Sequence, residues 1–226
     1  MCGRYSLIAE ITQLALRFEF EAGGLAQPPR YNVAPTQMVL TVGSGEPRQA
    51  SYMRWGLVPS GAGGVSAGAP MINARAETIA ERPSFRTALR ERRCLIPADG
   101  FYEWRRGNGS QSPVRVTLAS GEPFAFAGLW ETWRDPNGDP VGSCTIITTQ
   151  ANELLRPIHD RMPVILTRDL ESLWLDDEMR DTAALGSLLV PYDSGLMDLY
   201  EVSTLVNSAF NDGPELLAPP RQTRLL

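Results

Sequence analysis

The chain reads CLIPADGFYEW from Cys94 to Trp104, and this apolar and aromatic run predicts β-structure. Side chains alternate between the two faces of a strand, so Phe101 and Glu103 share one face while Tyr102 and Trp104 occupy the other. A carboxylate among such aromatic residues is costly to bury unless it is paired. The pattern therefore makes Glu103 a candidate site residue.

Similar short runs on both sides of this stretch set the predicted fold class. The other β-like runs are residues 38–42, 51–57, 71–74, 114–118, 124–131, 144–149, 163–166 and 199–203. Helices are predicted at about residues 7–20, 84–91, 151–157, 168–175 and 179–189. Because strands and helices do not alternate regularly, we predict an α+β fold with a mainly antiparallel, barrel-like sheet and peripheral helices. We expect one domain over residues 1–226, a mobile Gly/Ala-rich loop at 60–69 and a disordered tail from about residue 213.

Composition narrows the classes of function. The 226 residues are 43% hydrophobic and 21% charged, which is typical of a globular protein with a full core. The net charge of −5 argues against a protein that coats DNA through a general positive field, but it leaves room for a local basic groove. The sequence has neither a membrane-spanning apolar run nor the apolar core of a signal peptide, so we expect a cytoplasmic protein with no membrane partner.

Cysteine and histidine are too few and too scattered for a metal site. Cys2, Cys94 and Cys144 form neither a CxxC pair nor an even disulfide set, and His159 is the single histidine. We therefore expect no metal site. One compact domain makes a monomer the default expectation, and no cofactor is expected.

Cys2 suggests a specific chemistry. Methionine aminopeptidase removes Met1 when the second residue is small, and this leaves a first residue that carries both an α-amine and a thiol. Their reference pKa values are about 8 and about 8.5, so part of the amine is a free base near neutral pH. A 1,2-aminothiol condenses with an aldehyde to an imine, which the thiol then closes into a thiazolidine ring. On position alone, a small residue near a frayed terminus is the simpler interpretation.

Eight sequence blocks in a fixed order support the chemical interpretation. They are Met1–Tyr5 (MCGRY), 32–37 (NVAPTQ), 54–59 (RWGLVP), 73–78 (NARAET), 92–104 (RRCLIPADGFYEW), 127–131 (AGLWE), 145–149 (TIITT) and 159–163 (HDRMP). This series resembles the SRAP family, the SOS response-associated peptidase domain, from Met1 to about Asn207.

The resemblance implies a role in DNA damage. Cys2 would crosslink to the aldehyde of a ring-opened abasic site in single-stranded DNA, and a lyase-like or autopeptidase activity would accompany it. The protein would associate with the nucleoid when bound to damaged DNA. The resemblance implies a catalytic set of Cys2, Asn73, Glu103 and His159, and a DNA-binding set of Arg4, Pro35, Trp55 and Arg75.

The chemistry of these residue types agrees with the roles, and each also has a structural alternative. Histidine exchanges protons near neutral pH, as loss of water from a carbinolamine requires, but His159 is equally well explained as a hydrogen-bonded residue at a strand entry. Asn73 is also typical of a turn cap. Arginine suits phosphate, although Arg4 and Arg75 would ordinarily be solvated surface charges. Trp55 is more often a core residue than a stacking platform.

The sequence departs from the family pattern at two places. Many members have a second tryptophan where Gly61 stands, and many have Lys-Gln-Pro and an aromatic residue where residues 111–114 read QSPV.

Two other functions stay open. One is a hydrolase with an N-terminal cysteine nucleophile, in which Asn73 stabilises an oxyanion. The other is a single-strand binder without covalent chemistry.

Overall fold

The computed structural model describes residues 2–59, 70–106, 111–135 and 137–219. Its strands are β1 (Tyr5–Leu7), β2 (Arg30–Val33), β3 (Met38–Val42), β4 (Ala50–Trp55), β5 (Asn73–Arg75), β6 (Arg93–Ala98), β7 (Gly100–Arg106), β8 (Gln111–Leu118), β9 (Phe124–Arg134), β10 (Pro140–Gln150), β11 (Arg161–Pro163), β12 (Ile165–Leu166) and β13 (Met197–Glu201). The α-helices are α1 (Ile11–Phe18), α2 (Pro83–Glu91), α3 (Arg168–Leu175) and α4 (Thr182–Ser187), and short 3-10 helices are η1 (Ala76–Thr78), η2 (Ser194–Leu196), η3 (Thr204–Asn207) and η4 (Pro214–Leu217).

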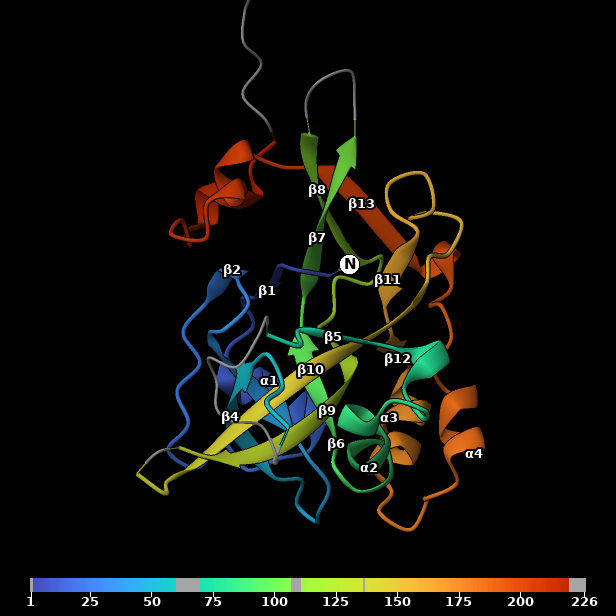
Figure 1. Cartoon of the computed structure of the whole chain (residues 1–226). Coiled ribbons are helices and arrows are strands. Elements are labelled where there is room, and N and C mark those ends of the chain that lie inside the picture. The colour runs from blue at the N-terminus through green and yellow to red at the C-terminus, as the bar shows by residue number, and fades with distance from the viewer. Residues whose placement is uncertain (1, 60–69, 107–110, 136, 220–226) are drawn as a thin grey trace, which may run out of the picture.

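A closed ring of strands forms the centre of the described structure. β10, β4, β3, β6 and β9 pair in that order, and β9 pairs again with β10 to close the ring. Four of these pairings are antiparallel and β10–β4 is parallel. Helices α2, α3 and α4 lie together at one side of this barrel, where α2 contacts β9 and β6 and α3 contacts β6 (Figure 1). The predicted α+β fold with a barrel-like, mainly antiparallel sheet is confirmed.

A second, fully antiparallel sheet carries the N-terminal strand. Its order is β13-β8-β7-β1-β2, so β1 lies between β7 and β2. The predicted strand at Cys94–Trp104 is in fact two strands, because the chain leaves the barrel and enters this sheet at Asp99. The Asp99 carboxylate accepts hydrogen bonds from the Ser6 hydroxyl at 2.7 Å and from Arg115 Nη2 at 2.8 Å. Gly100 leaves room for this network, because a Cβ there would lie 2.6 Å from Arg115 Nε and displace the guanidinium.

One hydrophobic core contacts both sheets. Tyr5 is central to it, with its ring edge-on to Trp55 and Phe126 at centroid distances of 5.4 and 5.7 Å. A smaller second cluster contains Tyr102, Val202, Val206 and Leu216. The second cluster contradicts the predicted disordered tail as far as residue 219, since Leu216 in η4 is fully buried. The predicted loop at 60–69 and the chain beyond 219 lie outside the described residues.

Three helix predictions need correction. The predicted helix at 7–20 begins only at Ile11, since Leu7 pairs with Arg30 in the sheet. It ends where Glu19 adopts a left-handed conformation with φ 59°. Residues 153–158 form turns instead of a helix, because Pro157 has no backbone N–H to donate to the turn before it.

The helix predicted at 179–189 is shorter than expected. It runs from Thr182 to Ser187, and the Asp181 side chain caps it by accepting the Ala183 N–H at 2.9 Å. Across the described chain, the helices are all too short or too polar to traverse a lipid bilayer.

Candidate functional site

Four separate segments bring the predicted catalytic residues together. Cys2 precedes β1, Asn73 begins β5, Glu103 lies in β7 and His159 precedes β11. The Tyr102 N–H donates to the Arg4 carbonyl at 3.0 Å, so the antiparallel register carries the N-terminal residues along the half of β7 that holds Glu103. Each element is fixed by the barrel or the second sheet, which gives the site a rigid frame.

Asn73 fixes the backbone of Cys2. Its Nδ2 donates to the Cys2 carbonyl at 3.0 Å. Asn73 is held in turn by parallel pairing of β5 with β10, opposite Ile146. Its Oδ1 is buried and has no hydrogen-bond partner among the described residues. A buried acceptor without a partner is uncommon in folded proteins, and this one lies on the side chain that holds Cys2.

The thiol of Cys2 is buried. Its side chain is 0% exposed in the chain that begins with Met1, and Sγ lies 3.9 Å from the Arg4 carbonyl. Burial, together with the nearby negative charge of Glu103, raises the pKa of the Cys2 thiol far above its usual range. The thiol is therefore protonated at neutral pH in this arrangement.

Glu103 is a buried carboxylate with a perturbed pKa. It is 4% exposed, and burial raises its pKa while the charge of His159 opposes the shift. A carboxyl group whose pKa is raised by burial is suited to passing protons near neutral pH. The prediction from strand alternation that Glu103 sits in an unusual environment is thus supported by its burial.

His159 is held in one orientation by the chain that follows it. The Arg161 N–H donates to His159 Nδ1 at 2.9 Å, which leaves Nε2 as the protonated nitrogen of the neutral ring. The exposed Asp160 carboxylate also lies 2.9 Å from Nδ1 and forms an ion pair only when the ring is charged. One nitrogen cannot accept and donate at once, so protonation at Nδ1 would exchange the Arg161 bond for the Asp160 ion pair.

Three arginines line an open cavity beside His159. The cavity is about 450 Å³ in volume, and Arg75, Arg156 and Arg161 contribute to its wall together with Gln150, Ala151 and Asp160. Arg161 is positioned by Glu77 Oε1 at 2.6 Å and by the Thr148 carbonyl at 2.6 Å. Its hydrogen bond lowers the pKa of Glu77.

Sequence reasoning missed three residues around this cavity. Arg161 and Thr148 lie within the recognised blocks at 159–163 and 145–149, so membership of a block was the available signal. Arg156 lies in the segment incorrectly predicted as a helix and had no signal of its own.

The predicted DNA-binding residues differ in accessibility. Arg75 is exposed, and Pro35 is half-buried. Arg4 donates to Asn32 Oδ1 and to the Val206 carbonyl, both at 2.8 Å. Within the described ranges no carboxylate forms an ion pair with Arg4, so its charge is held by neutral acceptors alone.

Trp55 does not fit the role expected for it. It is fully buried, its Nε1 donates to the Ile72 carbonyl at 2.9 Å, and its ring packs against Tyr5. A ring without exposed surface cannot stack on a base, so the structure places Trp55 in the core.

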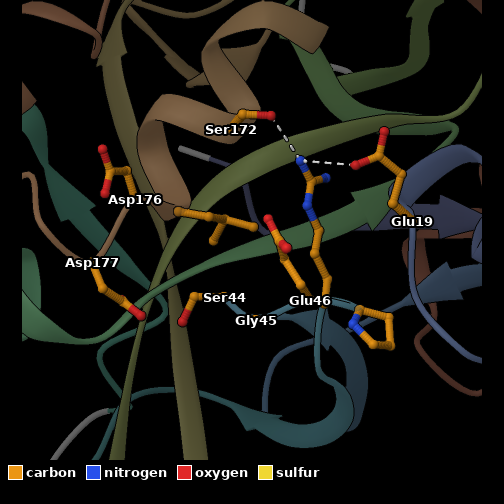
Figure 2. Close-up of a pocket in the computed structure, with 10 residues that line it drawn as sticks. Glu19, Ser44, Gly45, Glu46, Ser172, Asp176 and Asp177 are labelled. Atoms are coloured by element: carbon orange, nitrogen blue, oxygen red, sulfur yellow. Dashed lines mark hydrogen bonds and ion pairs between the residues drawn. The ribbon is translucent and has the colours of Figure 1, made fainter.

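A larger opening lies elsewhere, between α3 and the segment before β4. It has a volume of about 640 Å³, and Figure 2 shows Ser172 and Glu19 among its lining residues. Arg48 Nη2 donates to the Ser172 hydroxyl at 2.9 Å and forms an ion pair with Glu19. Its other charged residues are Glu46, Asp176 and Asp177. Because carboxylates outnumber the one guanidinium, this opening does not suit an anionic ligand.

The match to a family model identifies the chain. The model of the SOS response associated peptidase (SRAP) family matches residues 1–209. The chain belongs to the SRAP family. Among its relatives is the abasic site processing protein YoqW of Bacillus subtilis (strain 168), which is 49% identical over 96% of this chain and 99% of that protein. The abasic site processing protein HMCES of Rattus norvegicus is 34% identical over 74% of this chain and 56% of that protein.

Solved structures of other proteins agree with the fold. A crystal structure of a protein from Bacteroides thetaiotaomicron has a TM-score of 0.88 and 28% identity, and it covers 96% of this chain and 99% of that one. A protein from Bordetella bronchiseptica gives a TM-score of 0.77 with 29% identity, covering 89% of this chain and 100% of that one.

No metal centre is visible in the SRAP fold over the part of the chain that the structure describes. These residues contain no group of three or more histidine, cysteine, aspartate or glutamate side chains placed to hold an ion.

Proposed function

We propose that this protein captures abasic sites in single-stranded DNA as a covalent adduct of Cys2, formed after Met1 is removed. The observation that carries the proposal is the Asn73–Cys2 hydrogen bond, which holds the N-terminal backbone beside Glu103. The names of the relatives as abasic site processing proteins support the substrate class.

The first bond is made by the α-amine. The buried thiol is protonated, so the amine released by Met1 removal is the stronger nucleophile at neutral pH. It adds to the C1′ aldehyde of the ring-opened sugar and gives a carbinolamine, which loses one water molecule to form an imine. Glu103 and His159 are the groups placed to move the protons, and positioned acid–base catalysis contributes about 10²–10⁴-fold.

The second bond is made by the thiol. Sγ adds to the imine carbon and the thiol proton is transferred to the nitrogen, which closes the thiazolidine without an oxidant or cofactor. A carboxylate at Glu103 is a suitable base for the thiol, because its charge already acts on Cys2. The open acceptor Asn73 Oδ1 is suited to receive an N–H of the released amine.

The arginine-lined cavity supplies the phosphate contacts in this proposal. Arg75, Arg156 and Arg161 present a local positive surface on a protein of net charge −5. Arginine's planar fork matches two phosphate oxygens. Single-stranded DNA suits the site, since a duplex would first have to be unstacked. We propose a cytoplasmic monomer that reaches the nucleoid only through damaged DNA.

A lyase-like side reaction and a peptidase activity are the two alternatives to covalent capture. The imine is the intermediate from which an abasic strand is cleaved, and ring closure by the thiol removes it. A peptidase acting through Cys2 requires a thiolate, which the raised pKa of the buried thiol opposes. The observations therefore favour covalent capture.

The test is an adduct that survives denaturation. Wild-type protein is mixed with an oligonucleotide that carries one abasic site, then heated and run on a denaturing gel, while intact mass reports whether Met1 is absent. We expect a shifted band for wild type and none for Cys2→Ala. Cys94→Ala, which removes another buried thiol, should retain the band. A full-strength band from Cys2→Ala, or from protein that quantitatively retains Met1, would refute the proposal.

A further inference from the structure

Phe210 is an aromatic side chain in open solvent close to the proposed site. It is 99% exposed, more than any other large hydrophobic side chain among the described residues. We propose that Phe210 stacks on an unpaired base of the single strand that the site holds. This inference rests on the proposed function and extends the binding surface to the C-terminal segment 203–217.

The loop that carries Phe210 is fixed on both sides. Asn32 Nδ2 donates to the carbonyl oxygens of Ser208 at 2.9 Å and Asn211 at 2.8 Å. Asn211 Nδ2 donates to the Leu205 carbonyl at 2.8 Å. The exposed ring is therefore mounted on an anchored turn.

The same segment is tied to the N-terminal site. Asn207 Oδ1 accepts from Trp104 Nε1 at 2.7 Å, and Trp104 follows Glu103 in β7. The neighbouring Val206 carbonyl accepts from Arg4, two residues after Cys2. Phe210 is three residues beyond Asn207, so its Cα lies within about 11 Å of that of Asn207. In Figure 1 this segment, coloured red, lies beside β2 and above β1.

A nucleobase is the occupant that fits this position. Arg4 donates to the Val206 carbonyl of the segment that carries Phe210, and no described carboxylate neutralises its charge, so an anionic backbone would be attracted to this edge. Every base has a π-face, so stacking on Phe210 would strengthen binding without reading sequence. An apolar protein surface or a second copy of the chain could pack against the Phe210 ring, but it would make no use of the positive charge of Arg4.

Phe210→Ala tests the inference with a DNA that cannot crosslink. The probe is a fluorescent single-stranded oligonucleotide with a tetrahydrofuran abasic analogue, which has no aldehyde, and fluorescence anisotropy at fixed salt gives Kd. We expect Phe210→Ala to raise Kd about 5- to 150-fold, the range that corresponds to 1–3 kcal/mol of stacking per base. Phe210→Tyr keeps the π-face and should stay within about threefold of wild type.

Leu16→Ala is the matched control. Leu16 is 85% exposed on α1, which contributes no residue to the arginine-lined cavity, so its loss should leave Kd unchanged. Equal Kd values for wild type and Phe210→Ala would overturn the inference. So would a loss of self-association, measured by light scattering, without a change in Kd. Failure of wild type to crosslink an aldehyde-bearing abasic strand would instead reject the proposed function, whatever Phe210 does.

Discussion

Replacing Asn73 by leucine separates the contribution of this residue to capture from its contribution to stability. Leucine has a similar volume but has neither the Nδ2 donor to the Cys2 carbonyl at 3.0 Å nor the buried Oδ1 acceptor that lacks a partner. Loss of Nδ2 leaves the buried Cys2 carbonyl without this donor, which costs about 1–3 kcal/mol. Removal of an unsatisfied buried acceptor returns about 1–3 kcal/mol. The two contributions are of similar size, so the free energy of unfolding should stay close to that of wild type.

The rate of capture should fall although the stability of the fold changes little. Without Nδ2, the Cys2 backbone loses the contact that aims the amine, and misplacement by about 1 Å reduces a reaction rate by about 10²-fold. The assay is a single-turnover time course of heat-stable adduct at saturating abasic oligonucleotide, with urea unfolding on the same samples. Asn73→Ala leaves a void as well and should lose both stability and rate. A rate for Asn73→Leu within about twofold of wild type would refute a positioning role for Asn73.

Three further substitutions test other parts of the structure. Glu103→Gln should slow adduct formation by about 10²–10⁴-fold. Burial raises the pKa of Glu103, so the protonated carboxyl group stabilises the fold fully below its unfolded pKa of about 4.3. This stability is lost as the pH rises through the folded pKa. In urea unfolding, Glu103→Gln should therefore be more stable than wild type at pH 8 but not at pH 4. Arg156→Ala should lower the slope of log Kd against log salt by about 0.7, and an unchanged slope would remove Arg156 from the phosphate surface. Arg93→Leu deletes a buried guanidinium that donates to backbone carbonyls of Leu89, Arg90, Trp174 and Asp176, so thermal or urea unfolding should show a loss of about 3 kcal/mol or more, while adduct formation per folded molecule is retained.

Local pattern in the sequence predicted the strands well and their long-range partners poorly. The runs at 38–42, 114–118 and 144–149 are strands, because side-chain type and periodicity report the burial of each segment. The division at Asp99 was missed, since it depends on Ser6 and Arg115, which lie 93 and 16 residues away in the chain. The ordered C-terminal segment was missed for the same reason, because Asn32 and Arg4 supply its anchors.

Sequence motifs identified the candidate site residues, but their burial and contacts could be read only from the fold. Strand alternation alone pointed to Glu103, and its burial follows from where β7 lies. No local pattern distinguishes an exposed Trp55 from a buried one, and the pairing of β4 with β10 decides the matter in favour of the core. Phe210 had no periodicity to mark it. Phe210 became a candidate base-stacking residue only because the structure ties the segment that carries it to Arg4.

The environment of Cys2 decides which chemistry its N-terminal position can support. A hydrolase needs a reactive thiolate first, whereas thiazolidine formation needs a free amine first and a thiol second. Burial holds the Cys2 thiol protonated, and Asn73 holds the Cys2 backbone, which carries the amine. In the proposed mechanism, the same burial that weakens a thiolate nucleophile would keep the sulfur from reacting until the imine carbon lies beside it. An environment of this kind favours a cysteine that acts once and stays attached over one that turns over.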